Sequence, residues 1–262
     1  MIRALYTAAS GMSAQQLNLD TIANNLANSS TVGFRQRVLQ FQDMIYQNLV
    51  TPGAAESNQT VGAGLQIGLG TKSSASEIIM TQGDMNKTDN PTDLAIQGAG
   101  FFQVQRPDGT IAYTRAGNFY RNSQGTLVDT QGDQLIPAIT IPPNATGVTI
   151  TQYGMVNATI PGQQNPQQLG QIQLATFANP GGLDSMGSNL YSATFSSGDA
   201  VLGNPGGPEG LGMLQQGYLE NSNVDVVGAF VQMVLAQRAY ESNSKVITAA
   251  NEMYSEVNNM VK

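Results

Sequence analysis

Apolar residues recur every seven positions at both ends of the chain, whereas its middle shows no such period. The N-terminal repeat consists of Leu5, Met12, Leu19 and Leu26, with Ile22 widening the stripe. The C-terminal repeat consists of Val226, Met233, Tyr240, Ile247, Tyr254 and Val261. A seven-residue apolar period predicts an amphipathic helix whose apolar side packs against other helices. We therefore expect one helix at each end, the second capped by the stretch from Ser222 to Asp225.

The middle of the chain has the composition of short strands joined by turns. Twenty of the 29 glycines lie between Gly98 and Gly217, among short runs of Val, Ile, Thr and aromatic residues. The segment "FFQVQRPDGTIAYT" predicts a hairpin that turns at Pro107-Asp108-Gly109, and glycines 125 and 132 mark two further turns. Further strands are expected at 138–141, 147–151, 170–177 and 189–195, followed by a loop at 198–212.

The fold class that these patterns predict is α+β. Paired N- and C-terminal helices, coiled-coil-like, are expected to flank an inserted all-β domain with an extended linker segment. The expected boundaries are residues 1–34 with 221–262 for the terminal helical domain, 35–70 with 213–220 for the extended connecting segment, and 71–212 for the β-rich domain. The C-terminal apolar stripe is wider than one partner helix can cover, so further copies of the same helix would have to bury the rest.

The composition excludes several functions. Charged residues make up 11% of the chain and the net charge is -7, without a Lys/Arg cluster, which argues against nucleic-acid binding. The chain has no Cys and no His, so zinc, iron–sulfur and haem ligand sets and the Ser–His and Cys–His nucleophile pairs are ruled out. No apolar stretch is long enough for membrane insertion, and the N-terminal apolar run is too polar for a signal peptide. We expect no catalytic residue, cofactor or metal.

Two further patterns resemble functional sites. Asp89, Asp93, Asp108, Asp129 and Asp133 lie in turn contexts, where Asp hydrogen-bonds its own backbone, although two convergent carboxylates could serve a glycosidase. Glycines 62, 64, 68 and 70 do not form a dinucleotide loop because position 67 is Ile. The alternatives that stay open are a secreted carboxylate-dependent glycosidase of the cell wall and a monomeric adhesin or binding module.

Two short motifs call for a structural explanation. Asn24, Asn25 and Asn28 are mediocre helix formers, so we expect the first helix to end in turns over residues 28–33 while the amides bind backbone groups or water. The stretch from Gly98 to Phe102 predicts a tight entry into a strand, with its two phenylalanines on opposite faces. A platform that meets the extended segment is the functional alternative for this stretch.

Five blocks, in this order, resemble the rod and hook proteins of the bacterial flagellum: "ANNLANSSTVGF", "TDNPTDLAIQGAGFFQV", "YTRAGNF", "QGYLENSNVD" and "QRAYESNSK". With their flanks they extend the resemblance over essentially the whole chain. The chain length and residues 46–70 are most similar to distal rod members, with a proximal rod or hook subunit as the alternative. The family motif positions are Asn24, Asn25, Asn28, Gly33, Phe34, Gly98, Gly100, Phe101, Phe102, Gln237, Arg238 and Tyr240.

The resemblance implies a structural homopolymer. Subunits would leave the cell unfolded through the flagellar type III export apparatus, without a cleaved signal peptide, and form a helical tube. The terminal helices, with the apolar stripes as the assembly interface, would line its channel. The implied location is the periplasm-spanning rod of the basal body, acting as a drive shaft. The implied partners are proximal rod proteins, the hook protein, the rod-capping protein and the P-ring and L-ring bushing proteins.

Overall fold

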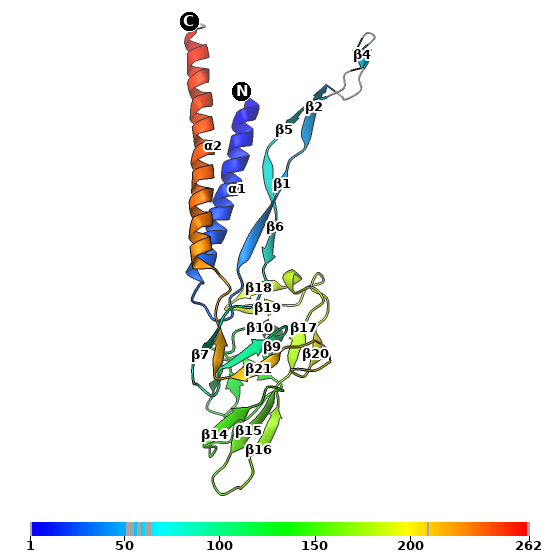
Figure 1. Cartoon of the computed structure of the whole chain (residues 1–262), viewed down its shortest axis with the longest axis vertical. Helices are drawn as coiled ribbons and strands as arrows, with labels where there is room; N and C mark the ends of the chain where they lie inside the picture. The colour runs from blue at the N-terminus through cyan, green and yellow to red at the C-terminus, as the bar shows by residue number, and fades with distance from the viewer. Residues whose placement is uncertain (1, 51–54, 57–58, 61–63, 209, 261–262) are drawn as a thin grey trace. The chain divides into compact units, whose positions relative to one another are not determined.

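A computed structural model describes residues 2–50, 55–56, 59–60, 64–208 and 210–260 (Figure 1). A helix lies at each end of the chain, α1 (Ile2–Ala27) and α2 (Val226–Met260), with a β-rich region between them, which confirms the α+β arrangement. Val261 of the predicted stripe, Gly62 of the glycine run and parts of 46–70 lie outside the described residues.

The chain divides into two compact units, each described by itself. We call Met1–Leu26, Arg37–Glu77 and Asp225–Lys262 the helical unit, and Ala27–Gln36 and Ile78–Val224 the β unit. Among the described residues, neither helix combines the length and the apolar character that crossing a membrane requires.

Within the helical unit, α1 and α2 lie side by side (Figure 1). Both helices bury small residues, namely Ala8 and Ala14 on α1 and Ala229, Ala236 and Ala250 on α2. At Gly11 a Cβ atom would lie 2.8 Å from Nδ2 of Asn243, so α1 comes close to the Asn243 side chain of α2 at this point.

The N-terminus of α2 differs from the predicted cap. Oδ1 of Asp225 accepts a hydrogen bond from the Val227 N–H at 3.1 Å, and the Ala229 N–H begins the helical ladder on the Asp225 carbonyl. Asp225 is therefore the N-cap. The stretch from Ser222 to Asp225 does mark the start of α2, but not as the predicted capping box, because the Ser222 hydroxyl accepts from the Val224 N–H in the preceding turn.

The rest of the helical unit is a β-ribbon. β1 (Arg37–Asp43) pairs with β6 (Thr71–Ile78), and β2 (Tyr46–Val50) pairs antiparallel with β5 (Leu65–Gly68). β3 (Ala55–Glu56) and β4 (Gln59–Thr60) pair beyond them. The ribbon is held to α1 where the Thr71 N–H donates to Oγ of Ser10 at 3.3 Å.

The β unit contains a nine-stranded sheet and smaller sheets. The order along the main sheet is β11 (Tyr120–Arg121), β12 (Leu127–Val128), β13 (Gln134–Ile136), β9 (Phe101–Gln105), β10 (Ile111–Thr114), β19 (Leu190–Ser192), β18 (Asp184–Gly187). β17 (Leu174–Thr176) pairs with both β9 and β20 (Val201–Gly203). A second sheet contains β14 (Gly147–Ile150), β15 (Met155–Thr159) and β16 (Gln167–Gln171). β8 (Leu94–Gln97) pairs with β21 (Met213–Gln216), and β7 (Met85–Lys87) with β22 (Tyr218–Glu220). A 3-10 turn, η1, covers Pro180–Gly182.

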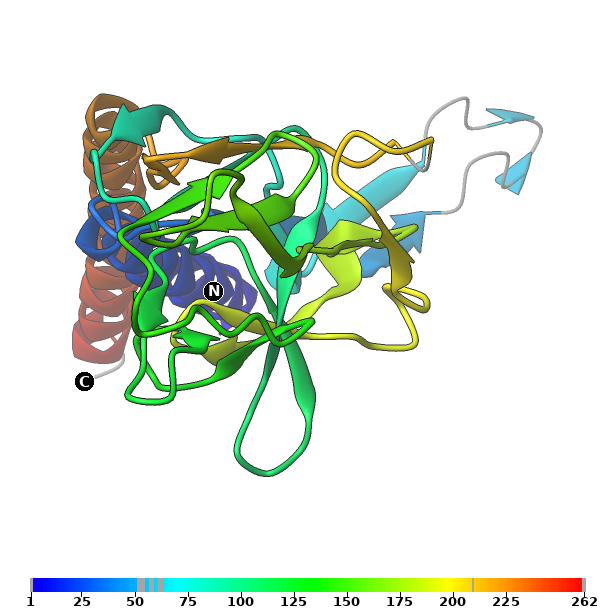
Figure 2. The ribbon, with the colours of Figure 1, turned by 90° about the horizontal axis from the view of Figure 1, so that it is seen from below.

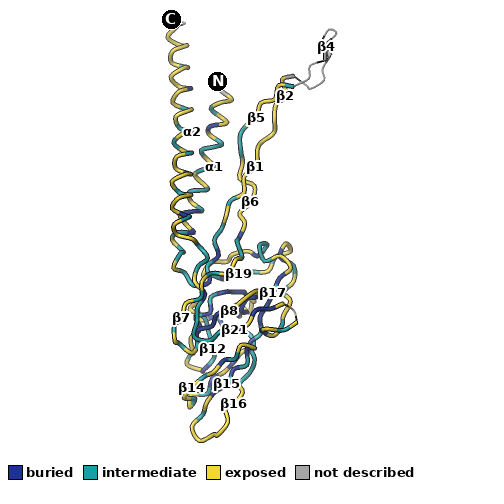
Figure 3. The backbone as a smooth tube through the Cα atoms, in the orientation of Figure 1, coloured by how far each residue is buried: buried dark blue, intermediate teal, exposed yellow. Residues whose placement is uncertain are grey.

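Figure 2 shows the strands of the β unit seen from below. Their buried apolar side chains form two clusters. Phe102 belongs to the larger cluster and packs edge-on against Phe119 with ring centroids 5.1 Å apart. Phe101 belongs to the other and packs against Phe177 at 5.8 Å. The two phenylalanines thus face opposite sides of β9, as predicted. Buried positions concentrate in this unit, whereas most of α2 is exposed (Figure 3).

Turns predicted from local sequence are present where expected. β9 and β10 form the predicted hairpin, and Oδ1 of Asp108 accepts from the Thr110 N–H at 2.9 Å in its turn. Glycines 125 and 132 occupy the other two turns with φ of +84° and +90°, a region that favours glycine. β14 confirms the strand expected at 147–151.

Other strand predictions need correction. Residues 138–141 form only an isolated bridge between Thr126 and Thr140, because Pro137 before them and two prolines after them provide no backbone donors. The segment 170–177 contains the end of β16 and the separate β17. The strand expected at 189–195 is limited to β19, and the expected loop at 198–212 contains β20.

Candidate functional site

In the helical unit, the side chain of Asn25 joins the end of α1 to the start of β1. Its Nδ2 donates to the Arg37 carbonyl at 2.7 Å, and its Oδ1 accepts from the Arg37 N–H at 2.9 Å. The amide therefore pairs with the backbone as a strand neighbour would, and it is 7% exposed. This pairing explains why the helix carries an asparagine at a position where Asn is a mediocre helix former.

The next residues end the helix by turn chemistry. In the β unit, Oδ1 of Asn28 accepts from the Thr31 hydroxyl at 3.1 Å, and its carbonyl accepts from the Thr31 N–H. Gly33 follows with φ of +69°, and a Cβ there would lie 2.6 Å from the Ala116 nitrogen. The turn expected over residues 28–33 is confirmed.

We expect Asn25→Ala to destabilise the helical unit by about 1–3 kcal/mol, because two backbone groups of Arg37 lose buried partners. Exchange of the Arg37 amide hydrogen, followed by NMR, measures this locally and should accelerate. Asn25→Asp is the matched variant, since its carboxylate still accepts from the Arg37 N–H but repels the carbonyl. If the Arg37 amide hydrogen exchanges in both variants as slowly as in the wild type, the role assigned to the Asn25 side chain is contradicted.

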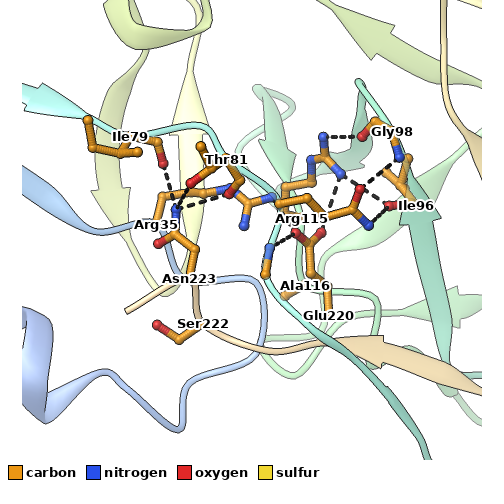
Figure 4. A network of polar contacts seen from close by, with 12 residues as sticks. Arg35, Ile79, Thr81, Ile96, Gly98, Arg115, Ala116, Glu220, Ser222 and Asn223 are labelled. Atoms are coloured by element: carbon orange, nitrogen blue, oxygen red, sulfur yellow. Dashed lines mark hydrogen bonds and ion pairs between the residues drawn. The ribbon is translucent and has the colours of Figure 1, made fainter. Parts of the chain in front are cut away.

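In the β unit, a carboxylate is buried between two arginines (Figure 4). Glu220 ends β22, and its Oε1 accepts from Nη2 of Arg35 at 2.6 Å and from the Gly83 N–H at 2.9 Å. Its Oε2 accepts from Nη1 of Arg115 at 3.3 Å. The side chains of Arg35 and Glu220 are 0% exposed and that of Arg115 is 6% exposed. We call these three residues the buried charge network.

Backbone contacts fix the segments that carry this network. Nη2 of Arg115 donates to the Gly98 carbonyl at 2.7 Å, and its guanidinium lies 5.4 Å from the ring centroid of Phe101. Near it, Oδ1 of Asn223 accepts from the Gln36 N–H at 2.7 Å, and Nδ2 donates to the Ile79 carbonyl at 2.8 Å (Figure 4). Stretches distant in sequence, around residues 35, 80, 115 and 220, thus meet at one place.

The charges in the network do not balance. Two guanidinium groups share one carboxylate, which leaves a surplus of one positive charge. Burial lowers the pKa of Arg115 to about 10, with Glu220 opposing the shift and Arg35 adding to it. Nε and Nη1 of Arg35 and Nε of Arg115 have no hydrogen-bond partner within the part of the chain that the structure describes.

The helical unit presents a second feature, an exposed apolar surface on α2. Its members lie three or four residues apart and each is more than half exposed: Val227, Phe230, Val231, Val234 and Leu235. By helical spacing this surface lies opposite buried Ala229 and Ala236. We call it the α2 outer face. Surfaces of this kind mark sites of protein association.

Most of the predicted stripe residues are half-buried or exposed, and one is buried. The half-buried members are Leu5, Met12, Leu19, Leu26, Met233, Ile247 and Tyr254, and Ile22 is buried. Val226 and Tyr240 are 39% and 38% exposed. Of the motif residues on α2, Gln237 and Arg238 are exposed, and Arg238 pairs only with nearby Glu241 on the surface at 3.2 Å among the contacts described.

Three models of flagellar families match the chain. They are described as flagella basal body rod protein at residues 5–35, flagellar hook protein FlgE/F/G D1 domain at 95–158, and flagellar basal body rod FlgEFG protein C-terminal at 215–260. The chain is 50% identical to the flagellar basal-body rod protein FlgG of Caulobacter vibrioides over 96% of its own length and 97% of that protein. It is 46% identical to FlgG of Borreliella burgdorferi and 41% identical to FlgG of Bacillus subtilis, in both cases over 99% of each chain.

The chain belongs to the flagellar basal-body rod protein family. Members of this family are structural components of the flagellar basal body and not enzymes, so the glycosidase alternative is set aside. The candidate carboxylates agree with this, since Asp93, Asp108 and Asp129 accept hydrogen bonds within their own turns. Among the described residues, no group of three or more Asp or Glu side chains is placed to hold a metal ion.

The sequence interpretation missed the buried charge network of this rod-family chain. Arg35 directly follows one of the family blocks, and Arg115 and Glu220 lie inside two others. The sequence does contain a signal for this network. Charged residues make up only 11% of the chain, yet these three charged residues lie at or within family blocks made mostly of uncharged residues. Asn223, which lies in the same block as Glu220, was read only as part of a helix cap.

Proposed function

We propose that this chain is the subunit of the distal rod of the flagellar basal body. Copies assemble into a helical tube that transmits torque to the hook and forms part of the export channel. The full-length similarity to rod proteins of the FlgG type supports this assignment.

The observation that carries the assembly proposal is the α2 outer face. Five large apolar side chains on consecutive turns are exposed in the single chain. Each contributes about 1.5–3 kcal/mol when a fully exposed side chain becomes fully buried, and roughly half of that from the present half-exposed state. A second copy of the helical unit supplies apolar surface of the same kind. Repetition of one contact from copy to copy then builds a helical filament.

The predicted stripes and the ribbon extend this interface. The α1 stripe and the Met233, Ile247 and Tyr254 positions are half-buried in one chain and become fully buried when neighbouring helices join them in a coiled-coil-like wall. On the ribbon, Val38, Ile45 and Tyr46 are 42%, 82% and 51% exposed. These side chains brace neighbouring copies, as expected for an extended connecting segment.

The same proposal defines the partners and the location. Proximal rod proteins lie below the tube, the hook protein and the rod-capping protein lie at its distal end, and the P-ring and L-ring bushing proteins surround it. The subunit reaches the periplasm-spanning rod unfolded, through the flagellar type III export apparatus.

Micrographs of basal bodies purified from cells that lack this protein test the assignment. We expect particles that end after the proximal rod and carry no hook. A complete rod that lacks only the hook would identify a hook subunit instead, and particles that lack any rod would identify a proximal rod subunit. Complementation with the wild-type gene should restore the full rod.

A further inference from the structure

We propose that a pocket in the β unit, beside Arg115, binds a carboxylate group. The pocket has a volume of about 240 Å³, and its lining includes Met80, Gln82, Gly98, Phe101, Arg115 and Pro180. It lies within one compact unit, so it exists in the single chain. The pocket itself does not depend on the assembly proposed above.

The first argument is the charge of the buried network. Arg35 and Arg115 share the single carboxylate of Glu220, and the three side chains are at least nine-tenths buried. A buried charge without a counter-ion is strongly unfavourable, so a second anion next to this network stabilises it. Of the two arginines, Arg115 lines the pocket and its side chain is 6% exposed, whereas the side chain of Arg35 is 0% exposed.

The second argument is the set of unused donors. Nη1 of Arg115 donates to Glu220 and to the Ile96 carbonyl, and Nη2 uses one of its two N–H groups on the Gly98 carbonyl, so the second Nη2–H is the donor left for a ligand. Nε is buried and has no partner among the described residues. A guanidinium has five N–H donors in one plane, which suits an oxygen pair such as that of a carboxylate. The side-chain amide of Gln82, which also lines the pocket, does not compete with a ligand for Arg115. Its nitrogen already donates to the Ile96 carbonyl, and its oxygen accepts from the Gly98 N–H.

The walls of the pocket select the class of anion. Met80, Phe101 and Pro180 are apolar and line the same cavity as the guanidinium. Such a wall favours a carboxylate on a short apolar stem and disfavours phosphate, which is more highly charged and needs more hydrogen bonds than the lining offers. The same chemistry is found in a free short-chain carboxylate and in a Glu or Asp side chain of a neighbouring copy.

Titration of the full-length chain with sodium propionate tests the site, with sodium chloride at equal ionic strength as reference. We expect saturable binding by calorimetry and a rise of about 5 °C in the thermal midpoint at a hundredfold excess over the dissociation constant. The NMR signal of the Arg115 Nε–H group should shift with the same saturation curve. Absence of saturable binding to the folded wild-type chain would overturn the proposal.

Two arginine variants make the test specific. Arg115→Met should lose propionate binding, whereas Arg106→Met removes the same charge from the exposed β9–β10 turn and should keep it. Equal binding by both variants would overturn the assignment to Arg115. If Arg115→Met does not fold, the Nε–H shift of wild-type Arg115 decides the question, and an unmoved signal at saturation rejects the site. Propionate binding that disappears in assembled filaments assigns the carboxylate to a neighbouring copy, and binding that persists assigns a free anion.

Discussion

Glu220→Gln is expected to destabilise the β unit by about 3–5 kcal/mol, because it leaves two buried guanidiniums without a counter-charge. The substitution conserves the volume of the side chain, so the decrease in the free energy of unfolding reports lost charge pairing and hydrogen bonding and not lost packing. Arg115→Met should cost less, since it leaves a neutral Arg35–Glu220 pair in place. The order of the two effects is the direct consequence of a network with two cations and one anion.

Urea unfolding of the full-length chain measures this order. The chain has no Trp, and Tyr113 and Tyr191 are buried in the β unit, so tyrosine fluorescence and near-ultraviolet circular dichroism report its unfolding. Glu241→Gln on α2 is the control, because its carboxylate is 43% exposed and pairs with Arg238 at the surface. That control should change the free energy of unfolding by less than about 1 kcal/mol. A Glu220→Gln effect as small as the control would refute the charge argument.

The network also shows why part of this structure escaped prediction from the sequence. The β9–β10 hairpin was predictable because Pro107, Asp108 and Gly109 encode their turn locally. Arg35 and Glu220 are 185 positions apart, and no local period connects them. The resemblance identified the blocks that contain or adjoin these residues, but the physical role of their charges needed the fold.

The sequence predicted where the two helices lie in the chain, but it did not predict which side of α2 is buried. A seven-residue period located α1 and α2 because apolar side chains repeat along one side of each. The start of α2, "VVGAFVQMVLA", has Gln232 as its one polar side chain, so periodicity could not decide which side is covered. The structure buries the Ala229 and Ala236 side and exposes Phe230 and Leu235. The expected strand at 138–141 failed for a different reason, since the flanking prolines limit pairing to a single bridge.

Leu235→Asp should abolish rod assembly and motility while the single chain folds normally. Leu235 is 63% exposed on the α2 outer face, so the aspartate remains in water in the isolated subunit. In the assembled tube the same carboxylate would be buried without a partner, at a cost of several kcal/mol in every copy. Because each subunit repeats the contact, the penalty accumulates along the rod.

Ser242→Asp is the matched control for this experiment. Ser242 is exposed one heptad further along the same side of α2, and its substitution adds the same charge beyond the apolar surface. In cells that lack the wild-type gene, we expect Ser242→Asp to restore motility in soft agar and complete rods in micrographs. Leu235→Asp should restore neither motility nor complete rods, although the circular dichroism spectrum of the purified variant should match that of the wild-type chain. Normal rods built from Leu235→Asp subunits would show that the α2 outer face stays exposed in the assembly, and the stripe containing Met233 and Ile247 would then have to carry the contact between copies.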